Sequence, residues 1–262
     1  ILKPFSSFSD QNNWVVASQK PQLKEFLDSE IQTKKIKGLI TEFGYGLVKK
    51  CGRVSTPNLI NELKKKLKDN YIKQDFDFKK LFYDHTKIVY NNIITQNIVF
   101  CEGYSIINNP FFKNLPVRGS KGEFLVVKIP NLNLDKIIKR SSIFIMPMEN
   151  QFYWVGATYD NSDKKNRPTQ LKKQWLIDRL ESIIKEPYKI VEHKASIRPT
   201  TIDRRPITGS HPNYKNIYLL NGLGSRGILL APTISSWLYN HIYESSPIPN
   251  EVDIKRFKDN NS

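Results

Sequence analysis

The sequence has few cysteines, no long apolar run and no metal-binding pattern, and each of these absences excludes a class of protein. Its two cysteines, Cys51 and Cys101, are far apart, and neither belongs to a Cys-x-x-Cys or histidine-rich pattern. Neither a disulfide framework nor a zinc site is therefore predicted. No apolar run approaches the ~18 residues that a membrane span needs, and no signal-peptide pattern opens the chain. We expect reduced cysteines, no metal, no membrane partner and a cytoplasmic location.

The beginning of the chain lacks a glycine-rich loop. Residues 1–43 contain no Gly-x-Gly-x-x-Gly pattern, and the chain begins at Ile1 instead of a methionine. The hydrophobic fraction is 39%, which is low beside the ~45–50% of ordinary globular chains. We therefore expect a processed or truncated polypeptide from which a buried strand or two is missing.

Acidic residues are outnumbered by basic ones, 25 against 41, which gives a formal net charge of +16. Such an excess can indicate a nucleic acid or an anionic surface as a partner. The lysines are scattered, and the densest group, Lys64–Lys66 with Lys68, falls largely on a helix face that needs solvated charge. Because no recognition motif accompanies the charge, nucleic acid is not expected as the main partner, and only tRNA is kept as an alternative.

Three helices are predicted from periodicity and from their start signals. Thr56 can cap a helix with Pro57 at its first position. A second helix follows Thr169, and a third begins near Ser225 with Pro232 about two turns in, which predicts a kink or a start in two steps. The residues expected on their apolar faces are Leu59, Ile60, Leu63 and Leu67 in the first, Leu171, Trp175, Leu176, Leu180, Ile183 and Ile184 in the second, and Ile228, Leu229, Ile234, Trp237, Leu238 and Ile242 in the third.

Two kinds of strand alternate along the chain. Residues 97–101 form a short apolar run typical of a parallel-sheet strand buried on both faces, and residues 216–220 form another strand. The β-branched and aromatic content of an antiparallel meander, with a turn at 149–150, is found in residues 122–129, 143–148, 152–158 and 188–197.

This alternation predicts an α/β (α+β) fold with a discontinuous, Rossmann-like domain and an inserted, mostly antiparallel β-sheet domain. The inserted domain is expected to comprise residues 1–54 and 115–195, and the discontinuous one residues 55–114 and 196–262. The polar tail after Pro247 is expected to pack loosely.

Three glycines, Gly222, Gly224 and Gly227, separate the strand at 216–220 from the apolar final helix. Glycines at a helix start let backbone N–H groups approach a ligand closely, and the positive end of the helix favours partial negative charge there. A loop whose glycines only turn the chain is the alternative. The spacing also matches a dinucleotide fingerprint formally, but no second βα unit with an acidic ribose partner follows it.

Arg198 stands before Pro199, which favours an extended backbone at the end of the 188–197 strand. An arginine at such a place suits a carboxylate, because its planar guanidinium can bind two oxygens. A salt bridge to Asp203 or Glu192 is the alternative, and from the pattern alone it is favoured. The four histidines are scattered without catalytic partners, so surface or capping roles are expected for His85, His193, His211 and His241.

Five segments together resemble the FAD-dependent oxidoreductases of the D-amino-acid oxidase and glycine oxidase group. Their order and approximate separations also match, and the resemblance extends from about Gly44 to the end. The segments are residues 121–127, 153–158, 197–199, 203–209 and 221–232.

The resemblance implies FAD as cofactor, a small amine or amino acid as substrate, and hydride transfer to the flavin from a C–H bond beside the amine. The discontinuous domain would then bind FAD, and the inserted domain would bind substrate. Arg198 matches the arginine that binds the substrate carboxylate, and Gly103 matches a glycine near the phosphate side of the cofactor. The segment expected at the cofactor, along the pyrimidine edge of the flavin, consists of Gly222, Leu223, Gly224, Ser225, Arg226 and Gly227.

Two departures from the family pattern stand out. Residues 1–43 lie where family members have a strand, a glycine-rich loop and a helix, and Phe144 stands where glycine-oxidase-like members often have a substrate-facing tyrosine. Two further interpretations therefore stay open: a non-catalytic, truncated remnant of such an enzyme, and a flavin oxidase that modifies tRNA.

Overall fold

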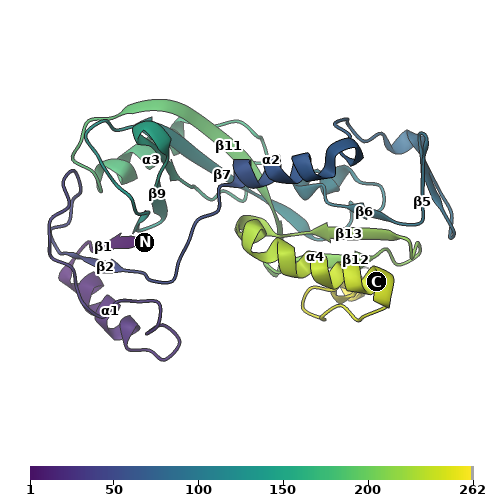
Figure 1. Cartoon of the computed structure of the whole chain (residues 1–262), viewed down its shortest axis with the longest axis horizontal. Helices are drawn as coiled ribbons and strands as arrows, with labels where there is room; N and C mark the ends of the chain where they lie inside the picture. The colour runs from purple at the N-terminus through teal and green to yellow at the C-terminus, as the bar shows by residue number, and fades with distance from the viewer. Residues whose placement is uncertain (261–262) are drawn as a thin grey trace. The chain divides into compact units, whose positions relative to one another are not determined.

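A computed structural model describes residues 1–260 and divides the chain into two compact units, each built from two stretches of sequence (Figure 1). Unit 1 comprises residues 1–53 and 121–197, and unit 2 comprises residues 54–120 and the chain from 198 onward. The domain boundaries predicted from the sequence fall after residues 54, 114 and 195. The roles assigned to the two domains remain predictions.

Unit 1 is built around a seven-stranded, mostly antiparallel sheet, in the order β11-β7-β10-β9-β8-β1-β2. Only the pair β1 and β8 is parallel among the registered neighbours. The fold class predicted from the sequence is confirmed here. The elements are β1 (Leu2–Pro4), α1 (Phe8–Ser18), β2 (Tyr45–Leu47), β7 (Val117–Lys128), β8 (Ile138–Arg140), β9 (Ile143–Pro147), β10 (Phe152–Gly156), α3 (Gln170–Glu181) and β11 (Lys189–Thr201).

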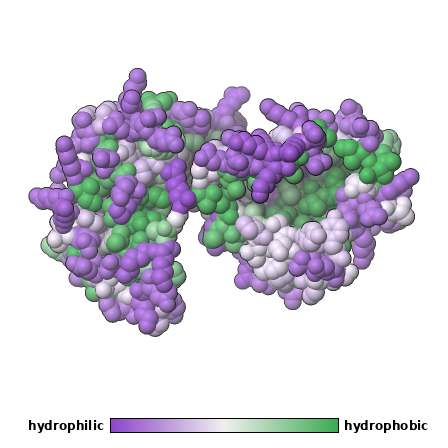
Figure 2. Space-filling view, in the orientation of Figure 1, coloured by the Kyte–Doolittle hydropathy of each residue, from purple (hydrophilic) through white to green (hydrophobic). Residues whose placement is uncertain are grey.

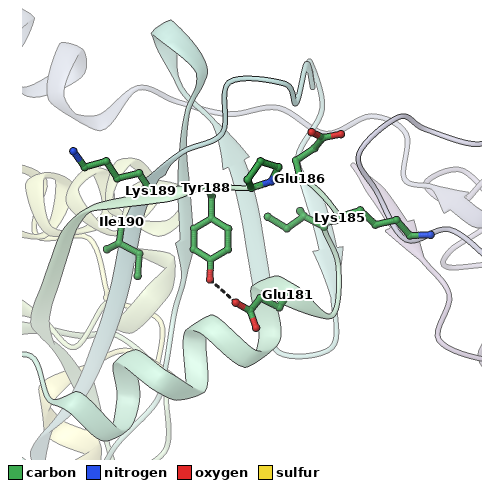
Figure 3. A pocket seen from close by; sticks show the side chains of 8 residues that line it. Glu181, Lys185, Glu186, Tyr188, Lys189 and Ile190 are labelled. Carbon is green, nitrogen blue, oxygen red and sulfur yellow. Dashed lines mark hydrogen bonds between the residues drawn. The ribbon is translucent and has the colours of Figure 1, made fainter.

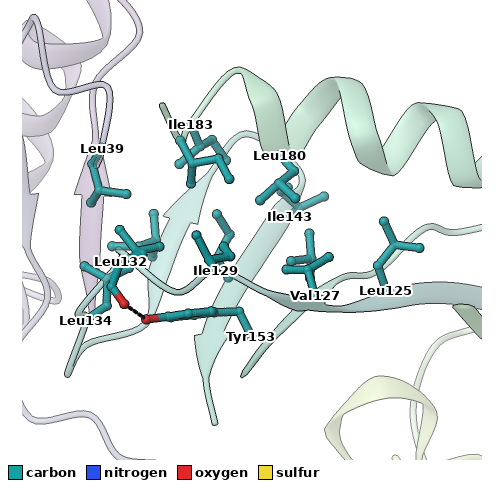
Figure 4. Close-up of a cluster of buried hydrophobic side chains, with 14 of the residues drawn as sticks. Leu39, Leu125, Val127, Ile129, Leu132, Leu134, Ile143, Tyr153, Leu180 and Ile183 are labelled. Atoms are coloured by element: carbon teal, nitrogen blue, oxygen red, sulfur yellow. Dashed lines mark hydrogen bonds between the residues drawn. The ribbon is translucent and has the colours of Figure 1, made fainter. Parts of the chain in front are cut away.

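One face of this sheet forms the core of unit 1 with α3 (Figure 4). Helix α3 follows Thr169 as predicted, and Thr169 is its N-cap: its side chain accepts a hydrogen bond from the amide of Lys172. Leu176 and Leu180 are fully buried against the strands, so truncating either to alanine would cost roughly 2–5 kcal/mol. Leu171, in contrast, was expected on the apolar face and is 77% exposed, because it lies in the first turn of the helix, before the turns that cover the sheet.

A buried ionic cluster lies at the N-terminal end of α3. Lys121 and Glu123 are each 1% exposed, and the Lys121 ammonium lies 3.1 Å from the Glu123 carboxylate and 2.6 Å from that of Asp163. Glu123 also accepts hydrogen bonds from the backbone amide and hydroxyl of Thr169 at 2.8 and 3.0 Å. His193 Nε2 lies 2.9 Å from Glu123, and burial lowers the pKa of this histidine despite the carboxylate. Its place beside a buried carboxylate differs from the surface or capping role expected.

Unit 2 contains a parallel pair of strands, β6 and β13, extended by antiparallel β12, and a separate antiparallel meander, β3-β4-β5. Helix α4 packs on β12 and β13 through Ile234 and Leu238. The elements are α2 (Thr56–Leu67), β3 (Leu81–Tyr83), β4 (Ile88–Tyr90), β5 (Ile93–Thr95), β6 (Ile98–Phe100), β12 (Ile207–Ser210), β13 (Ile217–Asn221) and α4 (Gly227–Glu244).

Several details of unit 2 differ from the expectations. β6 is parallel to β13 as predicted, but it is an edge strand and Val99 is 39% exposed, so it is not buried on both faces. Ile228 and Leu229 are 43% and 74% exposed, because the first turn of α4 does not face the core. The tail expected to be loose is anchored, since Ile248, Val252, Ile254 and Phe257 are all buried.

The predicted amphipathic helix α2 is present, but its apolar side packs against nothing that buries it. Ser55 is its N-cap, with Pro57 in the first turn, and none of its residues is buried. Figure 2 shows the hydrophilic side chains that gather over this helix. Within residues 1–260, no helix combines the length and apolar character that crossing a membrane requires.

Candidate functional site

Unit 2 brings together three segments that the sequence singled out: Gly103, the end of β11 at Arg198, and the glycine segment after β13. Arg198 is half-buried in β11, two residues before Thr200. Thr200 pairs with Leu223 in an isolated antiparallel bridge. The strand end that carries Arg198 therefore lies directly beside the glycine segment.

Asn221 joins the other two segments. This last residue of β13 is 3% exposed, and its amide nitrogen donates to the carbonyl oxygen of Gly103 at 2.9 Å. Its side-chain oxygen accepts from the backbone amide of Gly222 at 2.7 Å. Strand β6, which ends before Gly103, runs parallel to β13. Because the carboxyl ends of parallel strands share one edge of the sheet, the segments that follow the two strands meet here.

The glycines of this site serve two different purposes. Gly103, Gly222 and Gly224 all have positive φ, at 59°, 70° and 57°, a conformation that glycine adopts without steric cost. A Cβ at Gly222 would lie 2.8 Å from the Thr201 side chain, so close packing requires glycine there. At Gly103 and Gly224 the nearest atoms would lie 3.9 and 3.5 Å away, which is ordinary van der Waals contact, so at these two positions only the positive φ favours glycine.

Helix α4 starts in two steps, as its proline predicts. A 3-10 turn, Gly224–Arg226, precedes the α-helical residues from Gly227 onward, and Pro232 lies in the second turn. Arg226 is the N-cap and makes no side-chain capping bond, and Ser225 and Arg226 are exposed. N–H groups at such a helix start can hydrogen-bond an electron-rich ring edge or an anion.

The acidic residues proposed as alternative partners of Arg198 are engaged elsewhere. Asp203 lies 2.8 Å from the guanidinium of Arg256, and Glu192 lies 2.7 Å from the ammonium of Lys194. Burial works to raise the pKa of Asp203, but the hydrogen bonds from Arg256, Thr201 and the amide of Arg205 prevail and lower it to about 2. Both acidic residues thus have other cations as partners, and the role of Arg198 stays a prediction.

The histidines form no catalytic arrangement in unit 2. His211 Nδ1 accepts from the backbone amides of Asn213 and Tyr214, each at 3.2 Å, and His241 Nδ1 lies 2.9 Å from the carbonyl of Ser246. Both are capping roles, as expected. Among the described residues, no group of three or more histidine, cysteine or acidic side chains could hold a metal ion, and both cysteines are free.

A hollow on the surface of unit 1 lies apart from the predicted residues (Figure 3). Tyr188 points from the start of β11 toward α3, where its hydroxyl donates to Glu181 at 2.8 Å. Burial, followed by this carboxylate, raises the pKa of Tyr188 to about 12. None of the predicted site residues lines this hollow, whose walls come from residues 181 and 184–190.

Asn221 is the site residue whose role sequence reasoning did not identify. A polar side chain at the end of a buried strand, immediately before a glycine, is the signal that could have pointed to it. Its contacts join residues more than a hundred positions apart in sequence, and such a contact has no local pattern.

Replacing Asn221 with alanine should destabilise the protein. The change removes both side-chain hydrogen bonds from the half-buried carbonyl of Gly103 and the buried amide of Gly222. We expect the free energy of unfolding, measured by urea denaturation, to fall by about 2–4 kcal/mol. Asn213→Ala, at an exposed asparagine of the same unit, should change it by less than about 0.5 kcal/mol. A loss at Asn221 no larger than that of the control would contradict the bridging role.

Comparison with known families defines the class of protein to which this fold and site belong. The family model described as FAD dependent oxidoreductase matches residues 7–240. The chain therefore belongs to the FAD dependent oxidoreductase family, which confirms the resemblance inferred from the five segments.

The curated relatives of this chain include a protein named for tRNA biosynthesis and a glycine oxidase. A "tRNA 5-methylaminomethyl-2-thiouridine biosynthesis bifunctional protein MnmC" from Legionella pneumophila (strain Corby) is 23% identical over 88% of this chain and 39% of its own length. A "Glycine oxidase" from Bacillus subtilis (strain 168) is 32% identical over 54% of this chain and 39% of its own length. The chain thus spans about two fifths of the length of these curated relatives.

Solved structures share the fold. Glycine oxidase from Geobacillus kaustophilus matches with a TM-score of 0.74 at 19% identity, over 94% of this chain and 71% of its own. Glycine oxidase from Bacillus cereus ATCC 14579 matches with a TM-score of 0.73 at 18% identity, over 94% of this chain and 72% of its own.

Proposed function

We propose that this protein is an FAD-dependent oxidoreductase that oxidises an amine or an amino acid. The observation that carries the proposal is the convergence of Gly103, Asn221 and the 222–227 segment at one edge of the β6–β13 pair. In the open sheets of α/β folds, ligands bind outside the carboxyl ends of the parallel strands. The family, whose name states the cofactor, supports FAD as that ligand.

The residues at this edge fit parts of FAD. The first turn of α4 and the backbone of residues 222–226 would hold the pyrimidine edge, because N–H groups at a helix start can stabilise the negative charge that reduction adds there. The space beside Gly103, which a side chain would fill, would admit the chain of the cofactor near its phosphates. FAD, when bound, supplies a two-electron acceptor for the hydride of a C–H bond beside an amine.

The chain's own residues would then position the substrate. Arg198, on the strand that pairs with Leu223, would bind a substrate carboxylate with its planar guanidinium and fix the orientation of the reacting carbon. The amine becomes an imine when its carbon loses a hydride and its nitrogen loses a proton. This chemistry requires no strongly basic side chain. The absence of a catalytic histidine among the described residues of unit 2 agrees with this chemistry.

FAD titration tests the proposal. The full natural polypeptide that contains this chain would be mixed with increasing FAD, and thermal unfolding and the two-band flavin absorbance would be followed. At a concentration about 100 times the dissociation constant, FAD should add ~2.7 kcal/mol of stability. Riboflavin, which lacks the phosphates, should stabilise less.

A matched variant makes the titration specific. Gly103→Asn would place a side chain beside Gly103 with a smaller backbone penalty than most residues, because asparagine tolerates positive φ better than they do. We expect this variant to unfold at nearly the same temperature without FAD and to lose the stabilisation. If the unchanged protein neither gains stability nor shows the flavin spectrum, the proposal fails and a non-catalytic remnant of the enzyme becomes the better interpretation.

A second candidate substrate is an amine on a tRNA base. One relative named for tRNA 5-methylaminomethyl-2-thiouridine biosynthesis matches 88% of this chain at 23% identity, whereas the glycine oxidases from Bacillus licheniformis and Bacillus subtilis match 53% and 54% of it at 31% and 32% identity. The net charge of +16 agrees with an RNA partner. A tRNA complex whose dissociation constant rises steeply with salt would support this candidate.

A further inference from the structure

The tail of unit 2, residues 248–257, has no role in the proposed function, yet it is firmly fixed along β12 (Figure 1). Thr208 of β12 donates its amide to the carbonyl of Val252 at 2.9 Å and pairs with Asp253 in an isolated parallel bridge. The apolar side chains of Ile248 and Ile254 are buried. The tail is thus part of the packed unit, and its charged residues are held at defined places.

Arg256, in this tail, binds the turn between β11 and β12 with all three nitrogens of its guanidinium. Nε lies 2.8 Å from one carboxylate oxygen of Asp203, and Nη2 lies 3.3 Å from the other. Nη2 also donates to the carbonyl of Arg205 at 3.2 Å, and Nη1 donates to the carbonyl of Asp253 at 3.1 Å. The guanidinium carbon lies 4.2 Å from the centre of the Phe257 ring, and the side chain is only 14% exposed. These contacts fasten the turn to the tail.

The turn is coupled to the glycine segment through Thr201, the last residue of β11. Thr201 is 2% exposed, and its hydroxyl donates at 2.5 Å to the carbonyl of Arg205, the group to which Arg256 also donates. Arg204 in the turn has a φ of 59°, which is unfavourable for a residue with a Cβ, so the surrounding contacts must hold the turn in shape. On its other side, the Thr201 methyl group lies so close to Gly222 that a Cβ there would be 2.8 Å from it. A shift of the turn would therefore reach Gly222 by direct contact.

We propose that Arg256 is a positioning residue for the site at the carboxyl ends of β6 and β13. It acts through the 202–206 turn and Thr201, which hold Gly222 and the strand end that carries Arg198. The planar guanidinium suits this task, because its hydrogen bonds to a carboxylate and to carbonyl groups fix the direction of the turn as well as its distance. Such support matters at a reaction site, where a misplacement of about 1 Å can cost ~10²-fold in rate. The inference rests on the proposed function, since it concerns the same site.

The test measures two quantities in the full natural polypeptide: the dissociation constant of FAD, and the free energy of unfolding without FAD. Arg256→Met keeps an apolar chain beside Phe257 and removes every bond to the turn. We expect it to raise the dissociation constant of FAD roughly 3- to 30-fold, the range found for residues coupled to a site through intervening contacts. Asp203→Asn should have an effect of similar size. The double variant should add little to either change alone, because both residues act through one network.

Two further readouts separate positioning from a general contribution to folding. Arg256→Lys keeps the charge but cannot form the same set of hydrogen bonds, so it should recover only part of the FAD affinity. The absorbance bands of the flavin that Arg256→Met still binds should differ from those of the unchanged protein, because the groups expected at the ring edge have moved. A residue that only stabilises the fold would lower the free energy of unfolding and leave both the FAD affinity and the flavin spectrum unchanged.

Lys255→Met is the matched control. Lys255 is the preceding residue of the same tail, its side chain is 60% exposed, and its ammonium lies 3.9 Å from the Asp253 carboxylate, away from the turn. It should change neither quantity. An FAD dissociation constant that stays the same in both Arg256→Met and Asp203→Asn would overturn the positioning role and leave the proposed function standing. If Arg256→Met does not fold, Asp203→Asn decides the question. If the unchanged protein binds no FAD, the proposed function and this role fail together.

Discussion

Arg198→Ala is expected to lower kcat/KM for amine substrates that carry a carboxylate by roughly 10²–10³-fold, with flavin content unchanged. Two charge-assisted hydrogen bonds from a guanidinium to a carboxylate contribute about 3–4 kcal/mol together, and each 1.36 kcal/mol corresponds to a factor of ten. The prediction depends on the place of Arg198 at the end of β11, where Thr200 pairs with Leu223. The acidic residues nearest to Arg198 in sequence, Asp203 and Glu192, pair with Arg256 and Lys194.

The measurement compares two substrates of similar size, one amine with a carboxylate and one without. Arg198→Lys should recover only part of the activity, because an ammonium cannot form the two parallel hydrogen bonds. Arg205→Ala, at an exposed arginine of the turn that follows β11, should have little effect. An equal loss of activity on both substrates, or a loss of bound flavin, would instead assign Arg198 a structural role.

Among the substitutions of single charged residues proposed, Lys121→Ala should cause the largest loss of stability. It would remove the ammonium that lies 3.1 Å from Glu123 and leave a carboxylate that is 1% exposed without its cation. Breaking a buried ion pair in this way costs about 3–5 kcal/mol. The free energy of unfolding from urea denaturation measures the effect.

The ionic cluster also offers internal controls. Lys121→Met combined with Glu123→Gln removes both charges, so it should recover a substantial part of the stability that Lys121→Met alone loses. Lys136→Ala breaks an exposed pair with Asp135 and should change stability by less than about 1 kcal/mol. A loss below about 1 kcal/mol for Lys121→Ala would mean that water reaches Glu123 in solution.

Local signals were sufficient wherever one segment alone carries the information. Helix α3 begins after Thr169, and α4, which contains Pro232, starts in two steps, both as predicted. Asn150 has the positive φ that a turn between β9 and β10 requires. These features depend on the conformational preferences of neighbouring residues, which the sequence states directly.

Long-range packing decided the features that were missed or mistaken. The tail after Pro247 looked polar, yet Thr208 of β12 donates its amide to Val252, and the tail's spaced apolar residues are buried. Residues 97–101 looked like a strand buried on both faces, but Val99 of β6 is 39% exposed, because nothing covers its side chain fully on that face of the sheet. A hydrophobic pattern tells which residues can be buried, not which neighbours exist to bury them.

By itself, the sequence determined the family of this protein, the alternation of two sheet types, and the glycine segment that starts α4, because each depends on residues that are adjacent or regularly spaced. Only the tertiary structure decided that Asn221 joins Gly103 to Gly222, and that the buried pair of Lys121 and Glu123 contacts the half-buried Asp163. The physical reason is the same in each case. Parallel and antiparallel pairing brings distant residues into register, and that register is set by the packing of the whole unit.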